Sequence, residues 1–161
     1  MKRLLCIVSN LNQGGAETFL MKMYRNIDRE KYQLDFCIMS DIVGKYEQEA
    51  LSLGSRLYRV AAKSKNPIKC FLSIKNIVKE NKYEYVIRVN EHSLSVIDLI
   101  AAKCGGAKKL IMRSSNADSG SKKSRFLHKL FLFLPHNIPD VMIAPSTEAA
   151  LYTFGKRNVE K

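Results

Sequence analysis

The sequence predicts an α/β domain of three layers, in which helices cover both faces of a parallel sheet of about six strands. Short apolar and β-branched runs alternate with longer segments of helical period along all 161 residues. The short runs are continuously apolar, as strands buried on both faces are. The composition, 46% hydrophobic and 26% charged, is that of a globular chain, so we expect one domain spanning residues 1–161.

The first half of the chain predicts three strand and helix pairs. In order these are a strand at 3–9, a helix at 16–27, a strand at 34–39, a helix at 44–53, a strand at 57–60 and a helix from 66 onward. The last helix has the clearest start, because Asn66 is a good capping residue and Pro67 suits a first helical turn. Its expected apolar side consists of Ile68, Phe71, Leu72, Ile74, Ile77 and Val78.

The second half continues the alternation. It predicts a strand at 85–89, a helix at 93–103, a strand at 109–113, an amphipathic segment at 122–134, a strand at 141–144 and a helix from 147. Gly105 and Gly106 end the 93–103 helix, because glycine adopts the left-handed conformation at helix ends. In the amphipathic segment we expect the apolar face to be Phe126, Leu127, Leu130, Phe131 and Leu134, opposite Arg125, His128 and Lys129.

Several classes of protein are excluded or disfavoured. The charge-free apolar runs at 99–102 and 130–134 are too short to span a bilayer, and no secretory cleavage pattern follows Met1, so we expect a cytoplasmic protein. The four cysteines are more than thirty positions apart and no histidine lies near one, so we expect no metal site. Each cysteine stands in an apolar segment and is expected in the core.

The positive charge is concentrated in two stretches. Residues 99–139 carry +7 and residues 63–82 carry +5, which together account for the net charge of +12. Such a field attracts phosphates on nucleotides, nucleic acids or anionic lipids, although a lysine-rich solvated face also explains the 63–82 stretch. For the amphipathic segment we expect Lys122, Lys123, Arg125 and Lys129 to face a membrane, or else to be the exterior of an ordinary helix that covers the sheet.

Ligands of parallel sheets bind outside the carboxyl ends of the strands, which makes three loops candidates. The first loop places Gly14 and Gly15 before a helix, where backbone N–H groups can approach an anion such as a diphosphate. Ala16 and Glu17 complete that turn. The spacing is not the dinucleotide-binding fingerprint, and a simple tight turn is an equally good explanation.

The second and third loops carry polar side chains. Arg88, Asn90, Glu91 and His92 follow the fourth strand, and a histidine beside a carboxylate can accept a proton or donate to a sugar hydroxyl. The third loop begins with Arg113, Ser114, Ser115 and Asn116, whose donors suit phosphates and hydroxyl-rich ligands. A capping role for the histidine and an ordinary polar loop are the alternatives.

Three segments together carry a resemblance to a known family. VSNLNQGGAETFLMKMYRNIDREKYQLDF, LIAAKCGGAKKLIMRSSN and IAPSTEAALYTFG resemble the N-terminal half of the family-four glycosyltransferases. The resemblance implies a Rossmann-like, acceptor-binding domain of a GT-B enzyme, which transfers a sugar from a nucleotide diphosphate with retained configuration. It places Gly14, Gly15, Ala16 and Glu17 at the cleft near the donor diphosphate.

The sequence also departs from that family. Close relatives carry histidines after the fourth strand and at the end of the fifth, where Arg88, Asn90, Arg113 and Ser115 stand here. His92 is the nearest candidate for a catalytic histidine. Such enzymes are about twice this length and bind the nucleotide-sugar in a C-terminal domain, which is absent from this chain. We therefore expect residues 1–161 alone to be inactive and to bind no cofactor.

The resemblance suggests a sugar or lipid-linked acceptor, the nucleotide-sugar donor of the missing domain, and a place on the inner face of the plasma membrane in polysaccharide or cell-envelope glycan synthesis. One alternative is a truncated subunit that docks on a membrane or partner. Another is an NAD-dependent oxidoreductase, although Asp41 lies farther from the glycine loop than the acid of such enzymes. Nucleic-acid binding is suggested by charge alone and by no motif, so we do not expect it.

Overall fold

The protein folds into three layers around a six-stranded parallel sheet. The computed structural model describes residues 1–90, 92–115, 126, 128–130, 132 and 137–159. The strands are β1 (Lys2–Val8), β2 (Tyr32–Ile38), β3 (Leu57–Arg59), β4 (Tyr85–Asn90), β5 (Lys109–Ser114) and β6 (Val141–Ile143). They follow the order β3-β2-β1-β4-β5-β6 with every neighbouring pair parallel. The predicted fold class is confirmed.

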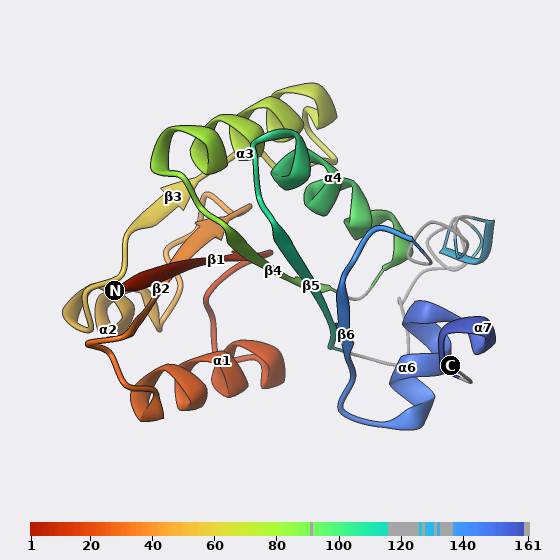
Figure 1. Cartoon of the computed structure of the whole chain (residues 1–161), viewed down its shortest axis with the longest axis horizontal. Helices are drawn as coiled ribbons and strands as arrows, with labels where there is room; N and C mark the ends of the chain where they lie inside the picture. The colour runs from red at the N-terminus through yellow and green to blue at the C-terminus, as the bar shows by residue number, and fades with distance from the viewer. Residues whose placement is uncertain (91, 116–125, 127, 131, 133–136, 160–161) are drawn as a thin grey trace.

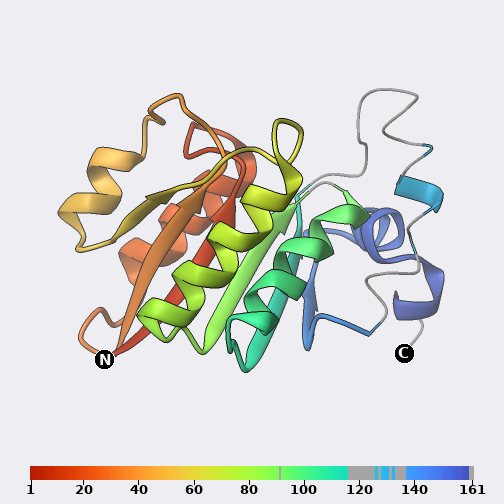
Figure 2. The ribbon, with the colours of Figure 1, turned by 90° about the horizontal axis from the view of Figure 1, so that it is seen from above.

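Helices cover both faces of this sheet (Figure 1). They are α1 (Gly15–Asn26), α2 (Glu47–Ser52), α3 (Pro67–Asn81), α4 (Val96–Cys104), α6 (Thr147–Phe154) and α7 (Lys156–Val159), with a 3-10 turn η1 (Ser93–Ser95) before α4. Helices α3 and α4 lie side by side across one face (Figure 2), where their buried residues share a core with β1, β4 and β5. Helices α1 and α2 cover the other face and share the second core.

Local signals explain where the elements begin and end. The Asn66 side chain accepts a hydrogen bond from the Lys69 backbone N–H at 2.9 Å, and Pro67 follows as the first residue of α3. Helix α4 ends just before Gly105 and Gly106. Gly106 has a φ of 104°, as expected for a glycine that ends a helix. Outside the predicted 122–134 segment, which lies mostly beyond the described residues, the predicted elements match the observed ones to within a few residues.

Three details of burial differ from the prediction. Cys104 is exposed at the end of α4, whereas Cys6, Cys37 and Cys70 are in the core as expected. Ile68 and Leu72 of α3 are exposed, because Cys70, Ile74 and Val78 are the residues that face the sheet. A cysteine suits the tight helix–sheet contact, so the buried side of α3 is rotated from the side that apolar content alone indicates.

The third difference lies in the 122–134 segment, of which residues 126, 128–130 and 132 are described. His128 is only 2% exposed, whereas Phe126 and Leu130 are exposed. A helix that covers the sheet with its apolar face is therefore the wrong expectation for Phe126 and Leu130, and the membrane-facing alternative stays a prediction. His128 is buried because its ring has polar partners on two other segments, as shown below. Lys129 is exposed, as expected; Lys122, Lys123 and Arg125 lie outside the described residues.

The strand order reverses between β1 and β4, which both lie at the centre of the sheet. Strands β1 and β4 pair from Leu4 and Tyr85 to Ile7 and Arg88, so their carboxyl ends are adjacent. The loops that leave these ends run in opposite directions, and a crevice opens between them. This switch point lies where the first two candidate loops meet. None of the described helices is long and apolar enough to span a membrane.

Candidate functional site

A pocket of about 320 Å³ lies at the switch point. It is bounded by the loop after β1, the first turn of α1, the end of β4 and the segment before α4. The lining residues are Ser9, Asn10, Ala16, Glu17, Arg88, Val89, His92, Ser95 and Ser115. Five of the residues singled out from the sequence, Ala16, Glu17, Arg88, His92 and Ser115, thus line one pocket.

Asn10, Ala16 and Glu17 form the α1 side of this pocket, and Gly14 and Gly15 lie between them in the chain without lining it. The Gly14 N–H donates to the Asn12 carbonyl at 2.9 Å, and Gly14 is the residue that caps α1 without a side chain. A Cβ on Gly14 would meet the Glu17 carboxylate, which folds back over the helix start. This is the third helical position, from which an acidic side chain characteristically reaches back. Glu17 therefore occupies part of the space above the α1 N-terminus.

Gly15 is different, because a Cβ there would meet nothing within 4 Å. Its φ is not positive, so neither the backbone conformation nor packing inside the domain requires glycine. The open space in front of Gly15 faces the positive end of α1. Gly15 therefore leaves room for a close approach to the backbone at the start of α1.

Arg88 lines the pocket, but its guanidinium is held by the protein. The side chain is 3% exposed, and its Nε donates to Asp98 of α4 at 2.7 Å. Its Nη1 donates to the Ile7 carbonyl at 3.1 Å and also contacts the Val89 carbonyl. Arg88 therefore links β1, β4 and α4 at the switch point, in addition to facing the pocket.

Lys63 is the second cation on Asp98, at 2.8 Å. Burial lowers the pKa of Lys63, and Arg88 lowers it further, while Asp98 opposes both effects. Two cations thus share the carboxylate of Asp98, which is only 1% exposed. The two cations exceed their one carboxylate by one positive charge. This charge lies behind the pocket and favours an anionic or electron-rich ligand.

His92 ends the β4 loop and lines the pocket. Its Nδ1 accepts a hydrogen bond from the Leu94 backbone N–H at 3.2 Å, which makes it the cap of η1. A neutral ring that accepts at Nδ1 carries its proton on Nε2. In this tautomer the ring donates from Nε2, so it suits a hydrogen bond to a sugar oxygen. The capping role and the pocket position predicted from the sequence are both present.

His128 is the site residue that sequence reasoning missed. Its Nδ1 accepts from the Ser93 N–H at 3.0 Å, and Ser93 Oγ donates to the His128 carbonyl at 3.0 Å. Its Nε2 lies 2.6 Å from the Tyr152 carbonyl, and the two rings are stacked with centroids 4.3 Å apart. The His128 ring also meets the His92 ring edge to face at 5.1 Å. His128 thereby fastens the His92 segment to α6.

The end of β5 divides its side chains between different neighbours. Arg113 is 8% exposed and lies over the Phe19 ring of α1 at 4.3 Å. Burial lowers the pKa of Arg113, and the Glu17 charge partly opposes this. Its Nη1 has no hydrogen-bond partner among the residues that the structure describes. Arg113 therefore lies beside the first turns of α1 with an unused donor.

Ser114 and Ser115 point to different places. Ser114 is fully buried, and its hydroxyl lies 2.6 Å from the Thr153 hydroxyl and 3.3 Å from the Ala149 carbonyl. Its polar atom therefore serves the contact between β5 and α6. Ser115 reaches the pocket. Glu91 and Asn116 lie outside the described residues, and so does the side chain of Asn90, whose backbone pairs with Ser114.

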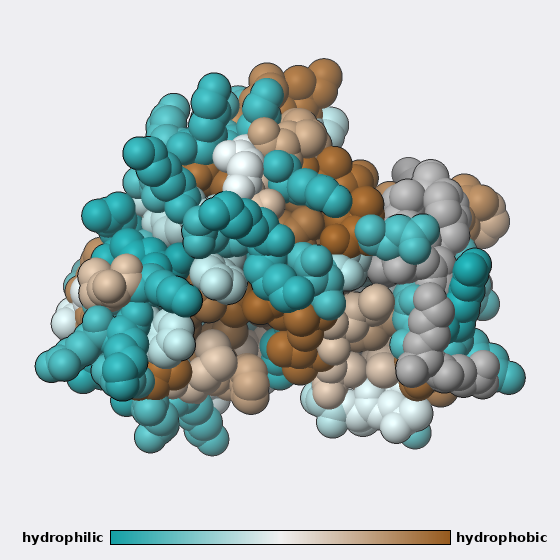
Figure 3. Space-filling view, viewed as in Figure 1, coloured by the Kyte–Doolittle hydropathy of each residue, from teal (hydrophilic) through white to brown (hydrophobic). Residues whose placement is uncertain are grey.

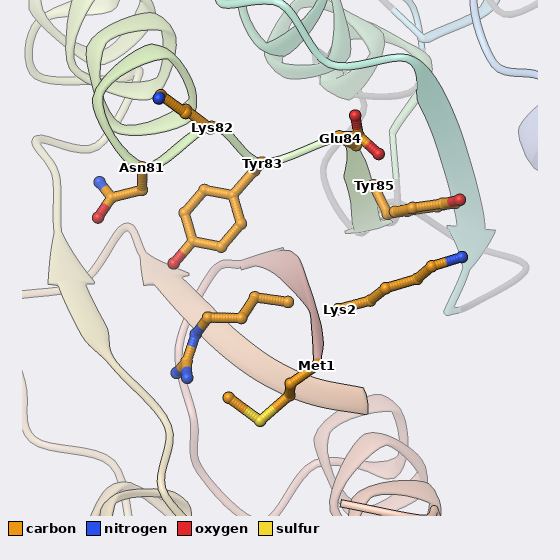
Figure 4. A pocket seen from close by; sticks show the side chains of 8 residues that line it. Met1, Lys2, Asn81, Lys82, Tyr83, Glu84 and Tyr85 are labelled. Carbon is orange, nitrogen blue, oxygen red and sulfur yellow. The ribbon is translucent and has the colours of Figure 1, made fainter. Parts of the chain in front are cut away.

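A second pocket of about 260 Å³ lies at the opposite edge of the sheet, among Met1, Lys2, Arg3 and residues 81–85 (Figure 4). Two of its polar side chains, Arg3 and Tyr83, are held by a structural network. Asp35 is fully buried and pairs with Arg3, accepts from the Tyr83 hydroxyl at 2.5 Å and from the Arg56 N–H at 2.6 Å. This pocket adjoins the amino ends of β1 and β4, so it is not a candidate. No group of metal-ligating side chains occurs among the described residues.

Comparisons with known proteins agree with the fold. No protein-family model matches the chain. The chain is 29% identical, over 99% of its length, to "Putative glycosyltransferase EpsF" of Bacillus subtilis (strain 168), of which it covers 43%. The chain thus spans less than half of that relative.

Two solved structures share the architecture. The first is MurG of Acinetobacter baumannii, with a TM-score of 0.61 and 13% identity; the match covers 89% of this chain and 41% of MurG. The second is described as a putative UDP-N-acetylglucosamine 2-epimerase of Listeria monocytogenes, with a TM-score of 0.66 and 11% identity; the match covers 98% of this chain and 43% of the epimerase. At these identities the likeness concerns the fold. The chain has the Rossmann-like fold of a GT-B domain.

Proposed function

We propose that this chain is the acceptor-binding domain of a nucleotide-sugar-dependent, retaining glycosyltransferase. The observation that carries the proposal is the switch-point pocket, which brings Ala16 and Glu17 at the start of α1 together with Arg88 and His92 after β4. The similarity to a glycosyltransferase over nearly the whole chain supports it. The donor would be bound by a second domain that residues 1–161 do not contain.

The residues of the pocket have distinct roles in this proposal. His92, in the tautomer set by the Leu94 N–H, donates to an acceptor hydroxyl, and Ser9, Asn10 and Ser115 supply further polar groups. Asn90, Glu91 and Asn116 belong to the same loops and are proposed to contact the acceptor. None of these groups needs to change its charge, so the domain orients the hydroxyl, which raises the rate by proximity.

The glycine side of the pocket is proposed to face the donor. The backbone at Gly14, Gly15 and Ala16 lies at the positive end of α1, where a diphosphate is stabilised. Glu17 covers part of this end, so we expect its carboxylate to move aside, or to meet a sugar hydroxyl, when the donor arrives. Arg88 and Arg113 then provide fixed positive charge behind the leaving diphosphate.

We also propose where such an enzyme works. Polysaccharide or cell-envelope glycan synthesis, at the inner face of the plasma membrane, fits a basic domain whose acceptor is a sugar or a lipid-linked sugar. Lys122, Lys123, Arg125 and Lys129 are the proposed membrane-facing residues of the 122–129 segment. Of these, Lys129 is exposed.

The test compares two proteins for release of nucleoside diphosphate from a panel of nucleotide-sugars. Residues 1–161 alone are expected to give none. The same domain joined to a GT-B donor-binding domain is expected to transfer sugar to a membrane-lipid extract. Turnover by residues 1–161 alone would contradict the division of labour. Hydride transfer with NAD by either protein would replace the proposal with the oxidoreductase alternative.

A further inference from the structure

An apolar hollow of about 280 Å³ lies on the outer surface where α3 meets α4. We call it the α3–α4 patch; its residues are Pro67, Ile68, Phe71, Leu72 and Ile97. Ile68 is 73% exposed and Leu72 is 48% exposed, although both belong to the expected apolar side of α3. Large aliphatic side chains grouped in this way on a surface typically mark an interaction site.

Lysines continue the same helical stripe. Ile68, Leu72, Lys75 and Lys79 follow each other at spacings of four, three and four residues, so they share one side of α3. Lys69 and Lys79 are exposed, and Lys75 is half-buried. Among the residues that the structure describes, Lys69, Lys75 and Lys79 form no ion pair, whereas Lys65 is paired with Asp41. Figure 3 shows apolar surface over one end of α3 and over α4, bordered by hydrophilic surface over the other end of α3.

The patch lies next to the switch-point pocket along the chain. His92 and Ser95 line the pocket, and Ile97, two residues further on, lines the patch. The patch also contains the first residues of α3, a helix that starts at the carboxyl edge of the parallel sheet. One short segment therefore contributes side chains to both features.

We propose that the α3–α4 patch docks this domain onto an anionic lipid bilayer, with Ile68 and Leu72 in the headgroup region and Lys69, Lys75 and Lys79 on lipid phosphates. The lining of the hollow is entirely aliphatic or aromatic side chain, with no polar group to fix the orientation of a protein partner. The lysine side chains lie beside the hollow, and none of them forms an ion pair with a described residue. Burial of apolar side chains together with attraction of nearby lysines is the pattern of interfacial membrane binding.

The docked orientation would place the pocket close to the bilayer surface. A lipid-linked acceptor could then enter the pocket with its sugar while its chain stays in the membrane. This inference deepens the proposed function by naming the surface that presents the acceptor. Vesicle binding requires no sugar transfer, so the failure of either proposal is recognised independently of the other.

The experiment measures flotation of residues 1–161 with vesicles of phosphatidylcholine, with and without phosphatidylglycerol. The variants are Ile68→Ser with Leu72→Ser, Lys69→Gln with Lys79→Gln, and the matched control Leu51→Ser. Leu51 of α2 is 48% exposed, the same fraction as Leu72, but it belongs to the opposite helical layer. Far-UV circular dichroism and the sedimentation coefficient of each variant are recorded as well.

We expect binding only to the phosphatidylglycerol vesicles. The serine pair should lower the partition coefficient about tenfold or more, and each lysine replaced should lower it about fivefold. Leu51→Ser should bind as the parent does. Parent-like binding by the variant with Ile68→Ser and Leu72→Ser would overturn the proposal. If neutral substitutions in the 122–129 segment then abolish binding, that segment is the docking element. The proposal would also be overturned if the parent sediments as a dimer and the variant with both serines sediments as a monomer. The patch would then bind a second copy of the chain.

Discussion

At the scale of single residues, Gly15 separates stability from function most clearly. A methyl group there meets no protein atom within 4 Å, whereas one on Gly44 would lie 2.5 Å from the Leu11 backbone. We expect Gly15→Ala to raise the free energy of unfolding slightly, by about 0.5 kcal/mol. Gly44→Ala should lower it by about 2 kcal/mol, because backbone atoms cannot move away cheaply. Urea titrations of both variants check these values.

The same substitution should impair the proposed enzyme. If the donor diphosphate approaches the backbone at Gly15, the added methyl group displaces it, and we expect sugar transfer by the two-domain enzyme to fall about tenfold or more. The transfer rate of Gly15→Ala is measured beside its stability. A stable variant with the parent rate would show that no ligand approaches this backbone.

Asp98 should be indispensable for stability. Asp98 is buried and pairs with both Arg88 and Lys63, so Asp98→Asn leaves the buried Arg88 and the half-buried Lys63 without their shared anion. We expect a loss of about 3 kcal/mol, which is typical when one partner of a buried ion pair is removed. Glu84→Gln, which removes an exposed pair with Lys108, is the control and should leave the midpoint of denaturation unchanged. Equal midpoints for the two variants would mean that Arg88 and Lys63 are held by other groups.

His128 should make stability depend on pH. Its neutral ring accepts from Ser93 and donates to Tyr152, and burial lowers its pKa below the usual value. Because the folded-state pKa lies below the unfolded one, the contribution of His128 is complete above about pH 6.5 and is lost as the pH falls through the folded-state pKa. The free energy of unfolding should therefore fall as the pH is lowered from about 6.5 through the folded-state pKa.

A non-titrating side chain provides the control for this pH dependence. Asn in place of His128 offers a side-chain oxygen to the Ser93 N–H at every pH. The drop attributed to His128 should be absent from His128→Asn. If parent and variant lose stability in parallel as the pH falls below about 6.5, other groups are responsible.

At the scale of elements, the start of α3 is a local device that can be removed alone. The Asn66 side chain accepts from the Lys69 N–H. We expect Asn66→Ala to cost about 1 kcal/mol of unfolding free energy. Asn76→Ala, at an exposed position inside the same helix, should be neutral or slightly stabilising, since alanine is the better helix former. A loss in both variants, seen by thermal melting, would argue against the cap.

The elements themselves could be predicted because their signals are local. Apolar runs, the Asn66 and Pro67 cap and the Gly106 stop each act within a few residues. Which side of a helix is buried could not be predicted equally well. The buried side of α3 is set by Cys70, Ile74 and Val78 against the sheet, and the apolar residues Ile68 and Leu72 stay outside.

Long-range contacts explain the residue that the prediction missed. His128 is buried because Ser93 and Tyr152, which are 35 and 24 residues away in the chain, satisfy its ring nitrogens. The periodicity of the segment around His128 does not predict these partners, because they belong to other segments. Arg88 was similarly expected to serve a ligand, and its commitment to Asp98 emerges only when α4 packs on β4.

At the scale of the whole molecule, strand order turns three separate loops into one candidate site. The reversal between β1 and β4 brings the α1 start, the end of β4 and His92 together, and β5 adds Ser115 from the neighbouring position. The sequence indicated the three loops, because each follows a strand. Their common pocket, and the α3–α4 patch beside it, depend on packing that no single segment encodes.

The central claim is that this pocket receives an acceptor sugar, and backbone amide chemical shifts test it most directly. Isotope-labelled residues 1–161 are titrated with soluble acceptor analogues, namely sugars and short-chain lipid diphosphate sugars, and separately with NAD. We expect saturable shifts confined to residues 9–17, 88–95 and 115 with at least one sugar, and none with NAD. Saturable shifts with NAD, or the absence of shifts in these segments with every sugar, would contradict the account.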